Sequence, residues 1–338
     1  MMRLNIGTIG NVVVRYRLLV MLAAVAVFGG WTLDDFLTLT TLQSILDRAA
    51  VVGFLALGLT PILIAGQIDL SIGSIMSLAA YATIALQPDL GNVPAAFIGL
   101  GVGILAGVVN ALAVVVFKVT SLVATLATLL IGASLALLIS NGQPASSADP
   151  LFGLFLTDNF LAILTPRSVL FIGAALLMFV WLKGTPSGRN LYAVGSSMPA
   201  AISAGINVNG YIAGVFVLSG FCAGAAGVIQ ALSSATGSPI AGSVLLIPAI
   251  TAVVIGGTRL EGGRGSSLAT LGGVVALGAL TTLSEYNGVP SYTQAVYTGL
   301  ILILLITLDR IAGGDEGKTT RTLRSAAVAK QTQQGGTS

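Results

Sequence analysis

The stretch GQIDLSIGS, at residues 66–74, stands between two long apolar runs at residues 45–66 and 70–86. Its glycines permit a tight turn of the backbone. Asp69 or Ser71 can accept hydrogen bonds from the free amide groups at the start of the helix that follows. The stretch therefore predicts a capped hairpin between two helices, and a hinge or lining element of a polar pathway is a compatible second interpretation.

A second stretch, GGTRLEGGRGS at residues 256–266, separates the apolar runs 244–257 and 266–284 in the same way. Its glycine spacing is that of a phosphate-binding loop, but Gly263 stands where that loop requires lysine, which argues against nucleotide binding. We expect a solvated turn, or a contact with a cytoplasmic partner, from its charged residues Arg259, Glu261 and Arg264.

The composition is that of a membrane protein. Of the 338 residues, 55% are hydrophobic and only 8% are charged, whereas soluble domains carry about 25% charged residues. Such a chain cannot cover its surface with polar groups, so lipid must surround most of it. The abundance of glycine, at 43 residues, fits close packing of helices and broken helices within a bilayer.

Several kinds of site are excluded by the residue counts. The chain has no histidine, which removes the commonest metal ligand and general base, so no metal site is expected. Its single cysteine, Cys222, cannot form an internal disulfide. A net charge of +3 with scattered basic residues argues against nucleic acid as a partner.

The apolar pattern predicts an all-α, polytopic membrane protein with about ten transmembrane helices. We expect residues 1–312 to form the membrane domain and residues 313–338, rich in Gly, Thr, Gln and Ser, to form a disordered cytoplasmic tail. The expected spans are 17–33, 45–66, 70–86, 94–117, 120–140, 168–182, 211–232, 244–257, 266–284 and 292–309.

The distribution of lysine and arginine predicts the orientation of the chain in its membrane. With the N-terminus inside and ten alternating spans, only Arg48 and Arg167 of the fifteen basic residues face outward. Basic residues concentrate on the cytoplasmic side of membrane proteins, so we expect both termini inside. No acid–base pair is expected deep in the membrane, because Asp69 and Glu261 both lie near the ends of predicted spans.

Small and polar residues within the spans predict helix contacts. Gly99, Gly103 and Gly107 recur at four-residue spacing, as do Gly220 and Gly224, which favours packing within the chain over a dimer seam. Three polar residues on otherwise apolar spans can bond across helices or line a polar pathway, and these are Asn110, Thr125 and Thr128.

The segment 183–210 is the longest polar stretch predicted on the inner side. Within it, residues 199–204 can form a short helix, with Ser197 as N-cap and Gly205 as its left-handed stop. A small, smooth alanine face on this helix would suit a groove on a partner protein, although a passive linker remains the alternative.

Four segments resemble the signatures of permease subunits from ribose-type ABC sugar importers. Residues 67–74 are similar to G-I-D-L-S-V-G-S, and residues 254–266 to G-G-T-S-L-x-G-G-R-G-S. Residues 188–195 match G-R-x-x-Y-A-V-G, and residues 200–208 match A-A-x-x-x-G-I-N-V. The resemblance covers about residues 45–309, and the hairpin positions concerned are Asp69, Ser71, Gly73, Gly256, Gly257, Gly263, Arg264 and Gly265.

This resemblance implies a mechanism and partners. Two permease subunits, identical or sister chains, would form the channel, and a cytoplasmic ABC ATPase would hold ATP and Mg²⁺. The permease itself carries no cofactor and catalyses no reaction. A periplasmic or lipid-anchored binding protein would deliver a monosaccharide or related polyol. The coupling loop would be residues 183–210, and its expected contact residues are Arg189, Pro199, Ala200, Ala201 and Gly205.

The chain departs from the family pattern in that loop. Residues 197–202 read SMPAAI, where the family commonly has N-P-E-A-A-R, so a mostly apolar dock replaces a charged one. Gln67 also replaces a glycine. Two rival functions remain open at this point: an ABC permease for branched-chain amino acids, and an ion-coupled secondary transporter that needs no ATPase.

Overall fold

The computed structural model describes residues 6–33, 35–158 and 163–308, and these residues are almost entirely helical. The tail predicted to be disordered, residues 313–338, lies outside the described residues. The elements run in the order α1 (Ile6–Thr32), α2 (Leu39–Ile64), α3 (Ile72–Ala85), α4 (Gln87–Leu90), α5 (Asn92–Ala111), a π-helical turn η1 (Leu112–Val116), α6 (Ser121–Ser140), β1 (Ala145–Ser146), α7 (Pro150–Leu154), α8 (Pro166–Gly184), α9 (Pro186–Ser196), α10 (Met198–Ser203), α11 (Val208–Ser234), β2 (Thr236–Gly237), α12 (Leu246–Ile255), α13 (Ser267–Tyr286) and a last helix (Ser291–Leu308).

The predicted fold class is confirmed. Seven of the described helices are long and apolar enough to cross a membrane, and three shorter apolar segments accompany them, at residues 16–32, 72–85 and 246–255. Together they correspond to the ten apolar runs of the sequence. β1 and β2 form a two-residue antiparallel pair, so strands contribute almost nothing to the architecture.

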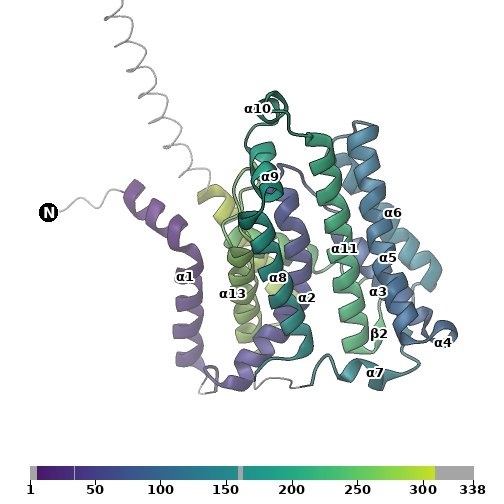
Figure 1. The fold of residues 1–338 in the computed structure, drawn as a ribbon. Helices are drawn as coiled ribbons and strands as arrows, with labels where there is room; N and C mark the ends of the chain where they lie inside the picture. The colour runs from purple at the N-terminus through teal and green to yellow at the C-terminus, as the bar shows by residue number, and fades with distance from the viewer. Residues whose placement is uncertain (1–5, 34, 159–162, 309–338) are drawn as a thin grey trace, which may run out of the picture.

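The bundle has two distinct ends (Figure 1). The helices α9 and α10 lie at one end, which we call the α10 end, while α4 and α7 lie at the other, the α7 end. The turns predicted to be cytoplasmic meet at the α10 end. There, the amide of Gly263 donates a hydrogen bond of 2.9 Å to the carbonyl of Ile64.

The helices α2 and α11 form the centre of the bundle. Over their most apolar windows, 83% of the residues of α2 and 72% of those of α11 are buried within the protein, against 17% for α6 and 6% for the last helix. The outer helices therefore turn apolar side chains away from the protein, as lipid-facing helices do.

The glycines predicted to pack within the chain do so. The helices α5 and α11 approach so closely that a Cβ on Gly103 would lie 2.7 Å from the Cα of Gly224, and one on Gly220 would lie 2.9 Å from the Cα of Gly107. Real Cβ atoms do not approach backbone atoms so closely, so only glycine fits. The dispersion contacts of this seam replace the hydrophobic drive that is missing between helices in lipid.

Two of the apolar segments are interrupted helices. The 14 residues of α3 extend about 21 Å and the 10 residues of α12 about 15 Å, at 1.5 Å per residue, and neither spans a hydrocarbon core of about 30 Å. The start of α3 meets the segment before α12, because a Cβ on Gly73 would lie 2.6 Å from the carbonyl oxygen of Gly242. The prediction that Gly73 serves a tight turn is therefore wrong: it lies within α3 and permits this close approach.

Substitution of Gly103 tests the α5–α11 seam. Gly103→Val should lower the thermal stability of the purified permease, because overpacking of this kind costs about 1–3 kcal/mol. The matched control is Gly101→Val, on the same helix, where a Cβ meets nothing within 4 Å. Both variants change helix propensity equally. Equal melting temperatures for the two in detergent would contradict the proposed seam.

Candidate functional site

A buried polar network surrounds Asp69, in the extended segment between α2 and α3. Its carboxylate accepts hydrogen bonds from the amide of Ser71 (2.9 Å), from the Ser71 hydroxyl (2.5 Å) and from the Ser219 hydroxyl (2.7 Å). Asp69 is 1% exposed and both serines are fully buried. Asp69 thus accepts a hydrogen bond from a backbone amide just before α3, as predicted. The Ser71 side chain, in contrast, accepts no hydrogen bond from the amides at the start of α3.

The network continues into α5 and α6. The Asn110 amide donates to the Ser71 hydroxyl at 2.8 Å, and the Thr128 hydroxyl donates to the Asn110 carbonyl oxygen at 2.6 Å. Thr125 bonds within its own helix and to the carbonyl of Ile68 at 3.4 Å. Asn110 and Thr125 therefore make the cross-helix contacts that the sequence allowed.

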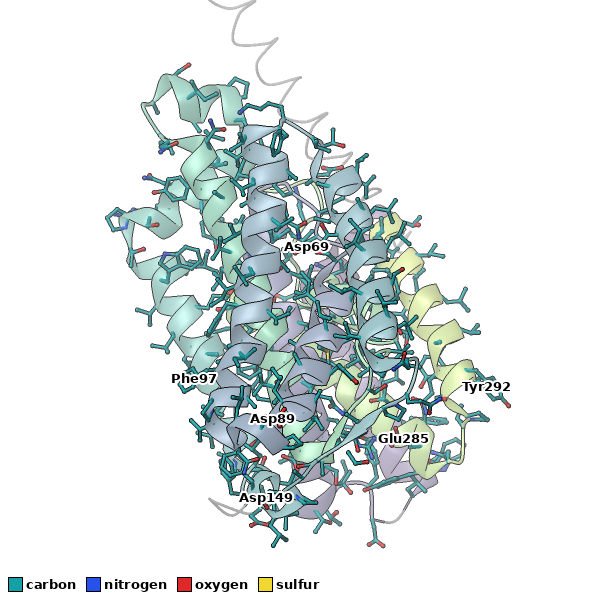
Figure 2. The ribbon with its side chains drawn as sticks, turned by 90° about the vertical axis from the view of Figure 1, so that its right-hand side faces the viewer. Asp69, Asp89, Phe97, Asp149, Glu285 and Tyr292 are labelled. Atoms are coloured by element: carbon teal, nitrogen blue, oxygen red, sulfur yellow. The ribbon has the colours of Figure 1, made fainter. Side chains whose placement is uncertain are left out.

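Asp69 lies deeper than its place in the sequence indicates. Ser219, its partner, is eleven residues from the start of α11, or about 16 Å along that helix. Figure 2 shows Asp69 well separated from Asp89, Asp149 and Glu285, which lie toward the α7 end. The expectation that Asp69 lies near the end of a span is wrong, because the chain runs inward from Gly66 before α3 begins. In the described part of the chain, no lysine or arginine pairs with it.

Three motif glycines meet at the α10 end. A Cβ on Gly262 would lie 3.0 Å from the Cα of Gly66 and 2.6 Å from the carbonyl oxygen of Gly195. Gly66 and Gly262 also have φ angles of 71° and 92°, which glycine alone adopts easily. The Tyr192 hydroxyl adds a hydrogen bond of 2.8 Å to the carbonyl of Gly265. Both hairpins and α9 thus form one packed unit.

The segment 183–210 forms two short helices rather than an open loop. In α10, the Ser197 side chain accepts a bond from the Ala200 amide, and Gly205 has φ +78°, as the sequence predicted. Pro199, Ala200 and Ala204 are exposed, as is Arg189 on α9. Ala201 is only 3% exposed and packs inward, whereas the sequence analysis placed it on the contact face. Ile202, at 63% exposed, is the large apolar side chain that α10 presents.

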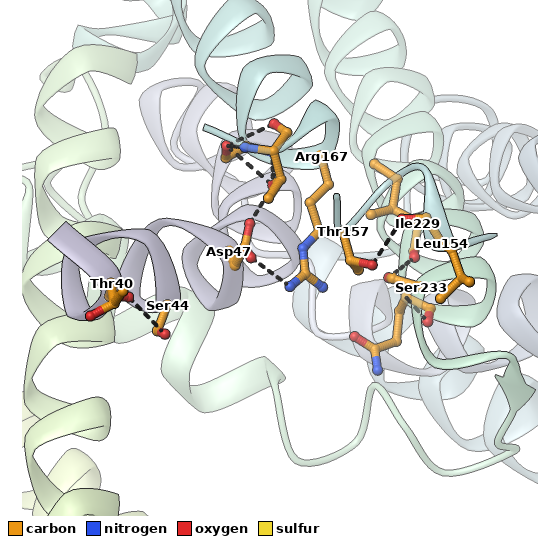
Figure 3. A network of polar contacts seen from close by, with 11 residues as sticks. Thr40, Ser44, Asp47, Leu154, Thr157, Arg167, Ile229 and Ser233 are labelled. Atoms are coloured by element: carbon orange, nitrogen blue, oxygen red, sulfur yellow. Dashed lines mark hydrogen bonds and ion pairs between the residues drawn. The ribbon is translucent and has the colours of Figure 1, made fainter. Parts of the chain in front are cut away.

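A cavity of about 570 Å³ opens at the α7 end between α2, α8, α13 and the last helix. Two ion pairs lie in its wall. Arg167 Nη2 is 3.1 Å from Asp47 Oδ2, and Arg48 Nη1 is 2.6 Å from Glu285 Oε2. Asp47 also accepts a hydrogen bond from Thr165, the N-cap of α8, so one carboxylate fixes both the start of that helix and its arginine (Figure 3).

The sequence analysis did not select these charged residues. Asp47 and Arg48 fall inside the apolar run 45–66, and Glu285 directly follows the run 266–284. A charge within a predicted span is itself a signal of function, and it could have identified this cavity. The pairing between Asp47 and Arg167, 120 residues apart, could not be read from the sequence.

The glycines at the remaining hairpin positions allow backbone conformations or close packing that other residues would disturb. Gly257 and Gly263 have positive φ angles of 92° and 72°, and Gly256 packs against α13, where a Cβ would lie 2.5 Å from the carbonyl oxygen of Ala269. A Cβ on Gly265 would meet Thr258 at 2.8 Å. No cluster of three or more metal-binding side chains occurs among the described residues.

The chain is a helical membrane domain with interrupted helices, a polar interior and a cavity open at one end, and interrupted helices are typical of membrane transporters. A family described as the permease component of branched-chain amino acid transport systems matches residues 41–305, and this chain belongs to it. The chain is therefore the membrane-spanning component of an ABC importer, and not its ATPase. This membership excludes the ion-coupled secondary transporter.

Several relatives cover most of the chain. The ribose import permease RbsC of Bacillus subtilis is 33% identical over 279 residues, 82% of this chain and 86% of that protein. The galactofuranose transporter permease YtfT of Escherichia coli is 36% identical over 267 residues, 78% and 77% of the two chains. The autoinducer 2 import permease LsrD of Escherichia coli is 32% identical over 262 residues, 75% and 79%. No solved structure gave a significant match.

The hydrogen bond between Asp69 and Ser219 can be tested by a double-mutant cycle. Asp69→Ala should destabilise the permease by about 1–3 kcal/mol, because it leaves buried donors without an acceptor. Ser219→Ala should cost less, since it removes only one of three donors. In the double variant the two effects should fall short of their sum by about 0.5–3 kcal/mol. Unfolding in mixed micelles measures this coupling, and strict additivity would contradict the bond.

Proposed function

We propose that this permease moves a monosaccharide or related polyol across the bacterial cytoplasmic membrane. The observation that carries the proposal is the similarity, over more than three quarters of the chain, to permeases named for ribose and galactofuranose. A branched-chain amino acid, named in the family description, is the second candidate.

In this proposal the α10 end faces the cytoplasm and meets a separate ABC ATPase through α9 and α10. The exposed side chains of Pro199, Ala200 and Ile202 would enter a groove on the ATPase. Behind α10, the glycine contacts among residues 66, 195 and 262 join α9 to both hairpins. ATP-driven movement of α10 would thereby reach the segment that carries Asp69.

The outer partners follow from the same proposal. A periplasmic or lipid-anchored binding protein would deliver the sugar at the α7 end. A second permease subunit, identical or a sister chain, would complete the channel. Both termini would be cytoplasmic, in agreement with the distribution of basic residues.

Uptake by the complete transporter tests the substrate. The permease, its ATPase and its binding protein are expressed in a strain that lacks sugar importers, and labelled pentoses, hexoses, polyols and leucine are offered singly. We expect ATP-dependent uptake of at least one sugar or polyol and none of leucine. Uptake of leucine without any sugar or polyol would overturn the proposal in favour of amino acid transport.

Gly205 tests the coupling role of α10. Gly205→Val should leave the permease folded and inserted, because nothing lies within 4 Å of the new Cβ. At φ +78° a β-branched residue adds about 1–3 kcal/mol of strain, which should shift the exit of α10. Transport and substrate-stimulated ATP hydrolysis should then fall together.

The matched control is Gly205→Asn, since asparagine tolerates the left-handed conformation, and it should couple almost as well as the parent. If Gly205→Val also couples like the parent, α10 is not the dock. The turn at residues 259–265 would then be the next candidate for the ATPase contact.

A further inference from the structure

We infer that a groove between α8 and α11, at the α10 end of the bundle, is a binding site for an anionic phospholipid. The polar rim of the groove binds the phosphodiester group, and the apolar part below it takes a segment of one acyl chain. The inference goes beyond the proposed function, from which it takes only the orientation of the chain, and it does not depend on the substrate. In that orientation the lipid belongs to the cytoplasmic leaflet.

The groove is a pocket of about 290 Å³ lined by residues of α8, α9 and the first half of α11. The helices α8 and α11 both pack against α2 and flank it, with α9 at their α10 end (Figure 1). Pockets that enclose whole small molecules measure about 300–1,000 Å³. The smaller volume of this groove therefore suits a segment of a larger ligand whose remainder lies outside the protein.

The groove has the depth of one lipid leaflet. Its lining runs along α11 from Asn207, the N-cap, to Leu218. This part of the helix rises about 16 Å at 1.5 Å per residue, or about half of a hydrocarbon core of about 30 Å. Large apolar side chains next to it are exposed, namely Leu177 (73%), Val180 (61%) and Phe221 (41%). The surface around the groove therefore faces lipid.

The polarity of the lining changes with depth in the order of a phospholipid. Ser187, in the first turn of α9, and Asn207 form the rim. Trp181 and Tyr211 also line the groove, within one helical turn of the end of α8 and the start of α11. Aromatic side chains with a polar tip favour the boundary between headgroups and acyl chains. The rim therefore lies at the level of the phosphate groups.

The deep part of the groove is apolar, and glycine leaves it open. Val215 and Leu218 line it together with Gly214. A Cβ on Gly214 would meet nothing within 4 Å, so no other side chain of the protein fills this space. An acyl chain is the apolar group that the surrounding membrane supplies, and it gains dispersion contacts there.

The rim offers hydrogen-bond donors that the protein leaves unused. In the described part of the chain, the Ser187 hydroxyl and the Trp181 indole N–H form no hydrogen bond. The Tyr211 hydroxyl accepts a bond of 3.0 Å from α9 and keeps its own hydrogen free. The Asn207 side-chain oxygen accepts a backbone amide of α11 at 3.1 Å, which leaves its NH₂ group free. A phosphodiester only accepts hydrogen bonds, so these donors match it.

The charge around the groove favours an anionic headgroup. From residue 159 to residue 260 the sequence contains no aspartate or glutamate, so α8 to α11 carry none. Lys183 and Arg189 lie on either side of Ser187 in the sequence, and both are exposed. The rim is also where α9 and α11 begin, and the start of a helix favours negative charge. Basic side chains at the membrane surface attract anionic lipids over zwitterionic ones.

Trp181 itself reports on the bound lipid. The chain has two tryptophans, so Trp31→Phe leaves Trp181 alone. The full-length variant is placed in phosphatidylcholine nanodiscs with a rising fraction of lipid brominated on one acyl chain, because bromine quenches the fluorescence of a tryptophan that it contacts. Brominated phosphatidylglycerol should reach half-maximal quenching at an about fivefold lower mole fraction than brominated phosphatidylcholine, the factor that attraction to one basic side chain provides.

The matched control is Trp181→Phe, in which Trp31 is the reporter. Trp31 is 82% exposed on α1, far from the groove in the sequence and outside its lining. It contacts bulk lipid, so the two brominated lipids should quench it equally.

Filling the groove separates a bound lipid from general attraction to a basic surface. Gly214→Leu, combined with Trp31→Phe, places a side chain in the apolar part and should abolish the preference for phosphatidylglycerol at Trp181. Gly173→Leu makes the same change on α8, outside the groove, where a Cβ also meets nothing within 4 Å, and should retain the preference.

The rim is tested by the loss of one donor. Ser187→Ala should raise the mole fraction of phosphatidylglycerol that gives half-maximal quenching of Trp181 by about two- to tenfold, the factor for one lost hydrogen bond. Ser134→Ala, at an exposed position of α6 outside the groove, should leave it unchanged.

Three other results would each overturn the inference. Equal quenching of Trp181 by the two lipids would remove the selectivity for an anionic headgroup. A preference that survives Gly214→Leu would place the lipid on the basic surface and not in the groove. A Trp181 that neither lipid quenches, while Trp31 is quenched, would show that the groove excludes lipid and would leave the ATPase as its occupant. Substrate uptake is measured separately, so these results leave the proposed function intact.

Discussion

Backbone groups at membrane depth must find their hydrogen-bond partners within the protein, and the interrupted helices α3 and α12 make this constraint visible. Between Gly66 and Ser71 the chain runs inward without helical bonds, and the Asp69 carboxylate accepts the amide that would otherwise be free. Before α12, the Ser77 hydroxyl accepts the amide of Gly242 at 2.8 Å. Non-helical backbone survives here because protein, and not lipid, surrounds it.

The glycines of the motifs allow these irregular segments to pack as one unit. At the α10 end, residues 66, 195 and 262 meet with backbone against backbone, so α9 and both hairpins are in direct backbone contact. Toward the middle of the bundle, Gly73 and Gly242 make a second such contact between the broken helices. Close-packed contacts of this kind have little room to relax.

The two polar regions of the interior differ in kind. The Asp69 network is buried, is satisfied by hydroxyl and amide groups, and joins α5 and α11 to the segment before α3. The cavity at the α7 end contains paired charges, an arginine with free donors, and open volume. The first arrangement satisfies its polar groups within the protein, whereas the second leaves the Arg167 Nε without a partner beside open volume.

The sequence by itself determined the membrane class, the ten apolar segments, the capped helix α10 with Gly205 as its stop, and the family, because these depend on local composition, spacing and motifs. Only the tertiary structure decided the depth of Asp69, the inward turn of Ala201, the meeting of Gly73 with Gly242, and the cavity with its pairing of Asp47 and Arg167. These features depend on contacts between residues as much as 169 positions apart, as for Gly73 and Gly242. A periodic apolar pattern predicts that a helix exists, but it carries no information on where that helix breaks within the bundle or on which neighbour satisfies a buried polar group.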